Sequence, residues 1–214
     1  MKHIYFVRHG ESEANVFHIH ATPTTPLTPR GHEQARITGM RCSELPLQLL
    51  ITSSYTRTKE TAAHVTEHTG LVPVESDLFV EASWVRALWG KDGRAPESQK
   101  VLEEIVAHWG EPGYHYADEE NFEELMARVD RALAFLARQP YEHIGVVTHG
   151  MFLRHLLGRA MFGPLFTPAL SLAWYHSLHV MENTALCVVT YHENNLEHPW
   201  RLKIWNDHAH LADA

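Results

Sequence analysis

The chain alternates short apolar runs with longer segments of helical periodicity, and this alternation limits the folds open to it. Runs rich in β-branched, aliphatic and aromatic residues occupy five places: residues 3–7, 49–52, 144–148, 185–191 and 201–205. Between them lie stretches in which apolar residues recur every three or four positions, most clearly from about Glu119 to Arg138. Strands that alternate with helices favour a mostly parallel sheet covered on both faces. We therefore expect an α/β fold, a three-layer α/β/α sandwich.

Cap and turn residues set the bounds of the remaining elements. Thr28 and Pro29 suit the N-cap and the first position of a helix that runs to about Leu45. Other expected elements are a loop at 15–29 with three prolines, a helix at 55–69 ended by Gly70, an edge strand at 72–79 and a helix at 151–159.

Residues 82–119 interrupt this regular pattern with glycines and prolines, and hold one amphipathic helical stretch at about 101–109. We expect a single domain over residues 1–214 in which this segment is a small helical and loop insertion, or lid, over the site. Its first part, residues 84–94, carries two tryptophans and three basic residues: Trp84, Arg86, Trp89, Lys91 and Arg94. Two interpretations stay open: a surface loop over packed tryptophans, or a lid that selects the substrate.

Two of the apolar runs end in a histidine that is followed by a glycine. His9 follows the first run, with Arg8 beside it, and His149 follows the run at 144–148. The C-terminal ends of strands in open α/β sheets point into a common crevice where ligands bind. Two imidazoles and a guanidinium at such an edge favour a site for an anion.

Composition excludes several classes of protein. The net charge of −8 argues against nucleic-acid binding through a broad basic surface. No apolar stretch approaches the ~20 residues of a membrane span, and no signal peptide is visible, so we expect no membrane partner. Cys42 and Cys187 are the only cysteines, and we interpret both as reduced core residues, which suits a cytoplasmic location.

Four segments place polar residues after these strands: VRHGES (7–12), SSYTRTKETA (53–62), Glu81 and THGM (148–151). LTPRGHEQA (27–35) and NDHAHL (206–211) add to the pattern. With these motifs, in this order, the chain resembles the histidine phosphatase superfamily, the phosphoglycerate mutase-like fold, over nearly its whole length. It departs from the family after Glu81, where a glycine and aromatic-acidic residues are common and this chain reads ASWVR (82–86).

The resemblance implies a nucleophile and a phosphate cage. His9 is the nucleophile that forms a phosphohistidine, and its other ring nitrogen should donate to a fixed acceptor. Arg8 and Arg57 hold phosphoryl oxygens with their planar guanidinium groups, and Asn15 approaches them too. No cofactor and no metal are implied.

The resemblance also implies the groups that complete the reaction. His149 lies across the phosphate and stabilises its charge as an imidazolium. Glu81 protonates the leaving oxygen and then activates water, help that is typically worth ~10²–10⁴ in rate.

The first hypothesis is a metal-independent phosphomonoesterase, similar to histidine acid phosphatases, that acts on a small phosphorylated metabolite. The alternatives are phosphoglycerate mutase-type phosphoryl transfer and a weakly active regulatory protein that binds a phospho-ligand. The mutase is less favoured because the chain is shorter than typical mutases and lacks the aromatic residue that many carry before Asn15. The pairs His18/His20 and His208/His210 raise a metal-binding protein as a further alternative. The substrate and the oligomeric state, a homodimer included, stay open.

Overall fold

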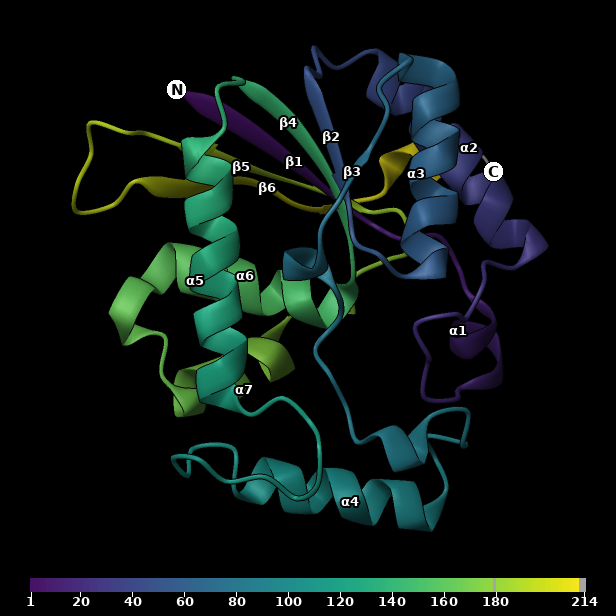
Figure 1. Ribbon diagram of the computed structural model, residues 1–214, viewed down its shortest axis with the longest axis vertical. Coiled ribbons are helices and arrows are strands. Elements are labelled where there is room, and N and C mark those ends of the chain that lie inside the picture. The colour runs from purple at the N-terminus through teal and green to yellow at the C-terminus, as the bar shows by residue number, and fades with distance from the viewer. Residues whose placement is uncertain (179, 212–214) are drawn as a thin grey trace.

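The computed structural model describes residues 1–178 and 180–211, and a six-stranded sheet forms its centre (Figure 1). The strands are β1 (Lys2–Arg8), β2 (Leu49–Thr52), β3 (Val74–Glu75), β4 (His143–Thr148), β5 (Leu186–Tyr191) and β6 (Trp200–Asp207). They lie in the order β3-β2-β4-β1-β5-β6, and the first four pair in parallel. Only β5 runs against its neighbours, so the mostly parallel sheet is confirmed.

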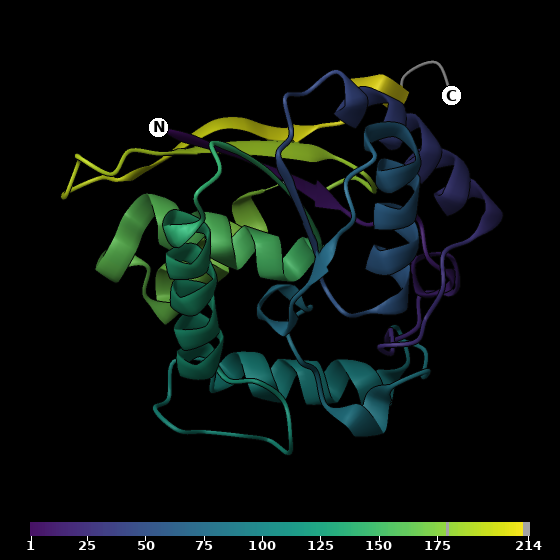
Figure 2. The ribbon, with the colours of Figure 1, turned by 45° about the horizontal axis from the view of Figure 1, so that its top comes forward.

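Helices cover both faces of this sheet and give three layers (Figures 1 and 2). One face carries α2 (Pro29–Ser43) and α3 (Thr56–Thr69), and the other carries α5 (Phe122–Arg138) and α6 (Gly150–Phe162). Alternate residues of β1 pack against the helices of the two outer layers, because successive side chains of a strand point to opposite faces. Ile4 and Phe6 pack in the core with α5 and α6, whereas Tyr5 and Val7 pack against α2 and α3. The expected sandwich is confirmed.

The remaining helices are short. They are α1 (Glu13–Phe17), α4 (Pro96–Ala107), α7 (Pro168–Ser177) and 3-10 turns at Asp77–Phe79, Arg86–Leu88, Gly163–Leu165 and Ala209–Leu211. None of the helices in the described ranges is long and apolar enough to cross a membrane.

The expected strand at 72–79 is wrong for most of its length. Only Val74–Glu75 pairs with β2. Ser76 then accepts a hydrogen bond from the backbone N–H of Leu78 (Oγ···N 3.4 Å) and begins a 3-10 turn. A serine that bonds the backbone two residues on offers the chain an alternative to the ladder, so the segment turns away from the sheet.

The bounds of two other segments and the presence of one helix also differ from expectation. The loop was expected to begin at Asn15, but α1 continues to Phe17. Ser12 and Asn15 cap the start of this helix. The helix expected from Glu119 begins at Phe122, because Asn121 supplies its cap. Helix α7 was not expected, since its apolar residues do not gather in one stripe.

Both cysteines are buried free thiols. Burial raises the pKa of Cys42 and of Cys187 to about 11. At neutral pH such thiols stay protonated, and the thiolate that would react is scarce.

The pairing of β1 with β4 fixes the position of the site. Arg8 lies opposite Thr148 in the parallel register, so the next residues, His9 and His149, leave the sheet side by side. The backbone N–H of His9 donates to the Thr148 carbonyl (3.0 Å), which extends the pairing by one bond. The two histidine rings stand 5.3 Å apart between centroids.

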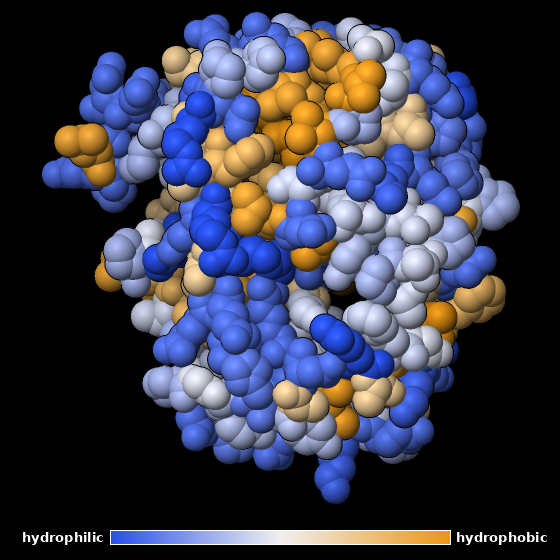
Figure 3. All heavy atoms as spheres, in the orientation of Figure 1, coloured by the Kyte–Doolittle hydropathy of each residue, from blue (hydrophilic) through white to orange (hydrophobic). Residues whose placement is uncertain are grey.

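Residues 82–119, here called the roof, lie across the C-terminal ends of the parallel strands, with α4 at the bottom of Figure 1. The roof has a small core of its own, in which Val85, Leu88 and Ile105 are buried. Isolated bridges join it to the loop after α1, between Ile19 and Asp92 and between His20 and Trp89. Figure 3 shows a small opening between the roof and the body above it.

One buried arginine fastens the start of the roof to α5. Arg128 forms a two-pronged ion pair with Glu120 (2.7 and 2.6 Å), and their side chains are only 10% and 13% exposed. The same guanidinium donates to the carbonyls of Val80 (2.8 Å) and Glu81 (3.3 Å) and stacks 4.5 Å from the centre of the Phe152 ring. Arg128 therefore fixes the backbone that carries Glu81.

We expect Arg128→Met to lower the free energy of unfolding by about 3–5 kcal/mol, because Glu120 would stay largely buried without its partner. Chemical denaturation measures the change. Arg131→Met, at an exposed position of the same helix, serves as the control and should shift stability by no more than about 0.5 kcal/mol. An Arg128→Met protein as stable as the wild type would contradict the role given to this ion pair.

Candidate active site

The ring of His9 is held in one orientation by two hydrogen bonds. Its Nδ1 lies 2.7 Å from the Gly10 carbonyl, which can only accept, so Nδ1 carries the proton. The Arg57 Nε–H donates to Nε2 (3.2 Å), so Nε2 carries a lone pair. Burial, then the charges of Arg57 and Arg8, lower the pKa of His9 well below 6.5. The structure thus supplies the fixed acceptor expected from the sequence and leaves a neutral nucleophilic nitrogen.

Gly10 is required by a close approach of the backbone. A Cβ at Gly10 would lie 2.4 Å from the Gly31 carbonyl oxygen at the start of α2. The loop after β1 can therefore pack against α2 only if this position has no side chain.

Arg57 is a buried cation and Arg8 a partly buried one, and both lie near His9. Burial lowers the pKa of both groups, and that of Arg57 falls to about 10, so both remain charged at neutral pH. Arg57 donates to the Thr22 carbonyl (3.0 Å), and Arg8 donates to the Met181 carbonyl. The Nε of Arg8 is buried and has no hydrogen-bond partner among the described residues. A desolvated donor of this kind is costly unless a ligand accepts from it.

His149 is completely buried behind the site and does not itself line the pocket. Its Nε2 lies 2.7 Å from Ser53 Oγ, and its Nδ1 finds no partner in the described part of the chain. Burial, then the charges of Arg57, His9 and Arg8, lower its pKa well below 6.5. The imidazolium expected at this position therefore requires an anion to stabilise the added proton.

Glu81 is the one carboxylic acid among the residues that line the pocket in the described structure. It accepts hydrogen bonds from the backbone N–H groups at the start of α6, Met151 (3.2 Å) and Phe152 (2.7 Å), and from that of Ala82 (3.0 Å). These bonds hold the carboxyl in place at the pocket wall. The two other acids weighed for this position do not line it: Glu11 accepts from Thr28, and Asp92 is paired with Arg94.

Asn15 also lines the pocket, with a fixed amide. Its Oδ1 accepts from the Ser12 backbone N–H and hydroxyl (both 3.0 Å) and from Asn183 Nδ2 (3.3 Å). Because the oxygen serves these donors, the NH₂ group is the part of Asn15 that can approach an anion.

Three supporting residues were not foreseen from the sequence. Ser53 contacts His149, and the Tyr55 ring packs edge-on to it at 5.2 Å. Asn183 donates to the backbone carbonyl of His9 (3.1 Å). Ser53 and Tyr55 could have been found from their place directly after β2, whereas Asn183 follows no strand end and carried no signal.

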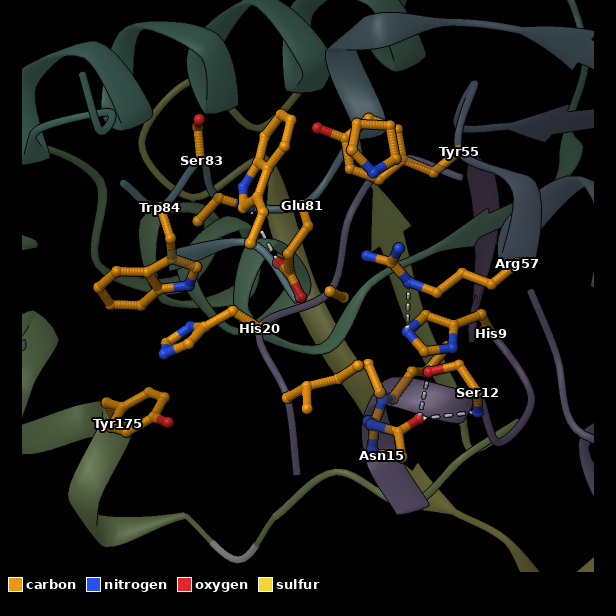
Figure 4. Close-up of a pocket in the computed structure, with 17 residues that line it drawn as sticks. His9, Ser12, Asn15, His20, Tyr55, Arg57, Glu81, Ser83, Trp84 and Tyr175 are labelled. Carbon is orange, nitrogen blue, oxygen red and sulfur yellow. Dashed lines mark hydrogen bonds between the residues drawn. The ribbon is translucent and has the colours of Figure 1, made fainter. Parts of the chain in front are cut away.

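A pocket of about 410 Å³ with two unlike sides is lined by His9, Arg57 and Glu81, among others (Figure 4). His9 and Arg57 lie on one side, Trp84 and Tyr175 on the other, and Glu81 lies between them. Trp84 and Trp89 bring the roof to the pocket, as a substrate-selecting segment requires. Arg86, Lys91 and Arg94 are not part of the pocket wall.

The histidine pairs considered as metal ligands serve elsewhere. His20 lines the pocket, and its Nε2 is buried without a partner among the described residues. His210 bonds to Arg41 (2.8 Å) and Thr38 (3.1 Å), and burial, with Arg41 next, lowers its pKa to about 4. Within residues 1–178 and 180–211, no group of three or more potential ligands gathers as a metal site would require.

Comparison with known proteins gives matches over nearly the whole chain. Residues 4–208 match the family model of the histidine phosphatase superfamily (branch 1). The chain is 28% identical to a probable phosphoglycerate mutase GpmB of Salmonella arizonae, over 99% of this chain and 95% of that protein. It is also 28% identical to an uncharacterized phosphatase PhoE of Bacillus subtilis, over 99% and 98%. The solved structure of Bacillus stearothermophilus YhfR has the same fold, with a TM-score of 0.77, 24% identity and coverage of 99% and 100%.

We expect sulfate to bind at this site with uptake of a proton near neutral pH. The lowered pKa of His149 keeps the free ring neutral, and a neighbouring dianion favours the charged ring and raises that pKa. Calorimetric titration in two buffers of different ionisation enthalpy measures the uptake. His149→Gln should abolish it, and His198→Gln, at an exposed histidine far along the chain, should not. Sulfate binding without proton uptake by the wild type would contradict an imidazolium role for His149.

Proposed function

The chain belongs to branch 1 of the histidine phosphatase superfamily, and we propose that it is a metal-independent phosphomonoesterase that works through a phosphohistidine on His9. One observation carries the proposal. A neutral His9, with Nε2 unprotonated, lies beside the buried Arg57 and the partly buried Arg8, and the Nε of Arg8 is a buried donor without a partner in the described structure. A phosphate dianion satisfies such donors and brings phosphorus to Nε2.

In the first step, His9 Nε2 attacks phosphorus. The N–P bond forms as the bond from phosphorus to the ester oxygen breaks, and Glu81 gives a proton to the departing alcohol. Arg8, Arg57 and the protonated ring of His149 stabilise the charge on the phosphoryl oxygens, and the Asn15 amide donates to one of them.

In the second step, water attacks the phosphohistidine. Glu81, now ionised, takes a proton from that water, the N–P bond breaks, and phosphate leaves with His9 restored to its neutral form. The backbone bonds to Glu81 keep its carboxyl at the same place in both steps.

Phosphoglycerate mutase activity is the second candidate, supported by the printed name of one relative. The pocket favours hydrolysis. Arg8 and Arg57 are the only Arg or Lys side chains among its wall residues, and both lie beside His9. A phosphoglycerate carries a carboxylate as well, for which this wall offers no further Arg or Lys. Incubation with 3-phosphoglycerate and its bisphosphoglycerate primer separates the two activities.

We expect His9→Ala to lower kcat with p-nitrophenyl phosphate by at least about 10⁴-fold, because it removes the nitrogen that attacks phosphorus. His198→Ala is the matched control and should retain wild-type turnover. In the wild type, rapid quenching should trap an acid-labile, base-stable phosphoenzyme, which mass spectrometry would place on His9. A folded His9→Ala protein with wild-type activity would refute the mechanism, because another group would then be the nucleophile.

Glu81→Gln should distinguish esters by their leaving groups. Loss of the proton donor should slow alkyl phosphates by about 10²–10⁴-fold. The p-nitrophenolate leaving group needs little protonation, so its ester should lose less than about tenfold in the first step. Single-turnover release of the alcohol measures that step alone. Equal losses on both esters would show that Glu81 positions the helix start and the substrate instead of donating a proton.

A further inference from the structure

A second cavity lies behind the aromatic side of the phosphate pocket. It has a volume of about 340 Å³ and lies between α4 of the roof and the helices α6 and α7 of the body. Trp84 and Tyr175 line both this cavity and the phosphate pocket. The two spaces therefore meet at these rings, on the side of the pocket opposite His9 and Arg57 (Figure 4).

The walls of this cavity are mainly hydrocarbon. Leu102, Ile105 and Val106 come from α4, Met151 from α6 and Leu172 from α7. Such walls gain little from contact with a sugar or a charged metabolite, and gain most from burial of carbon.

Three of the polar side chains in these walls, those of Ser171, Trp109 and His155, have hydrogen-bond partners. Ser171 Oγ accepts from Trp109 Nε1 (2.9 Å) and donates to the Pro168 carbonyl (2.7 Å). His155 Nδ1 donates to the Met151 carbonyl (3.0 Å), and burial lowers the pKa of its ring, which keeps it neutral. These groups stabilise the walls and leave carbon as the main surface offered to a ligand.

The volume of the cavity shows how large an occupant it can hold. A closed apolar cavity of about 150 Å³ is enough to bind benzene. The 340 Å³ here accommodates more than a single six-membered ring.

We propose that this cavity receives the alcohol portion of the substrate, so that the enzyme acts on phosphate monoesters of a largely apolar alcohol larger than one six-membered ring. The proposal rests on the phosphatase function above. In the bound ester, phosphorus lies at His9 and the ester oxygen points toward Glu81. The alcohol portion then extends from the phosphate pocket, between Trp84 and Tyr175, into the cavity next to α4.

A series of n-alkyl phosphates tests this assignment, because the leaving oxygen is chemically alike from ethyl to octyl while the buried apolar area grows. With each ester below its micelle concentration, kcat/KM should rise about two- to fourfold per methylene until the cavity is filled. A flat or falling series would overturn the proposal.

Filling the cavity should remove this preference. We expect Leu102→Phe, on the α4 wall, to lower the ratio of kcat/KM for octyl over ethyl phosphate at least tenfold. Leu172→Phe repeats the test from the α7 wall if the first variant does not fold, as circular dichroism would show. Glu103→Phe, at an exposed position of α4, is the control and should keep the wild-type ratio. An unchanged ratio in a folded cavity-filling variant would also overturn the proposal.

Alkylphosphonates separate this inference from the proposed function, because their P–C bond is not hydrolysed. Octylphosphonate should bind more tightly than ethylphosphonate and compete with sulfate in calorimetry. If no ester is hydrolysed but this order of affinity holds, the function fails and the cavity assignment stands. If esters are hydrolysed and chain length alters neither turnover nor phosphonate affinity, the cavity assignment fails and the function stands.

Discussion

The parallel pairing of β1 with β4 is the constraint on which the rest of the site depends. It brings together two histidines that lie far apart in the chain, and the bond from His9 N–H to the Thr148 carbonyl joins their backbones. A slip of one residue would turn every side chain of β1 to the other layer, where it would meet packing partners of the wrong size. The packing of Phe6 and Val7 on opposite faces therefore protects the geometry of the site as well as the fold.

Burial is what makes this small group of residues reactive. Arg8 and Arg57 stay charged in a desolvated place, while His9 and His149 become neutral beside them. The result is a local positive field inside a chain whose net charge is −8. Such a field acts at short range and with little screening, so it favours a dianion that enters the pocket over one that passes the surface.

Sequence alone predicted the elements that depend on local patterns. The strands that precede His9 and His149 and the helix opened by Thr28 follow from periodicity and caps. The pocket residues Arg57 and Glu81 follow from the resemblance to the family. The prediction of a strand at 72–79 was wrong because the Ser76 side chain accepts a hydrogen bond from the Leu78 N–H and begins a 3-10 turn there. Contacts between segments that are distant in the sequence could not be predicted, because local patterns carry no information about them.

Arg128 is the clearest example of such a contact. It follows Ala127 and precedes Val129 in a clean apolar stripe, and nothing nearby in sequence indicates that it binds Glu120 and the carbonyls before the roof. The roof itself offers one more consequence of its separate small core. Because Val85, Leu88 and Ile105 pack in a cluster of their own, substitutions there would act first on the roof and on the pocket wall that Trp84 and Trp89 supply, and only indirectly on the strand ends that hold His9 and His149.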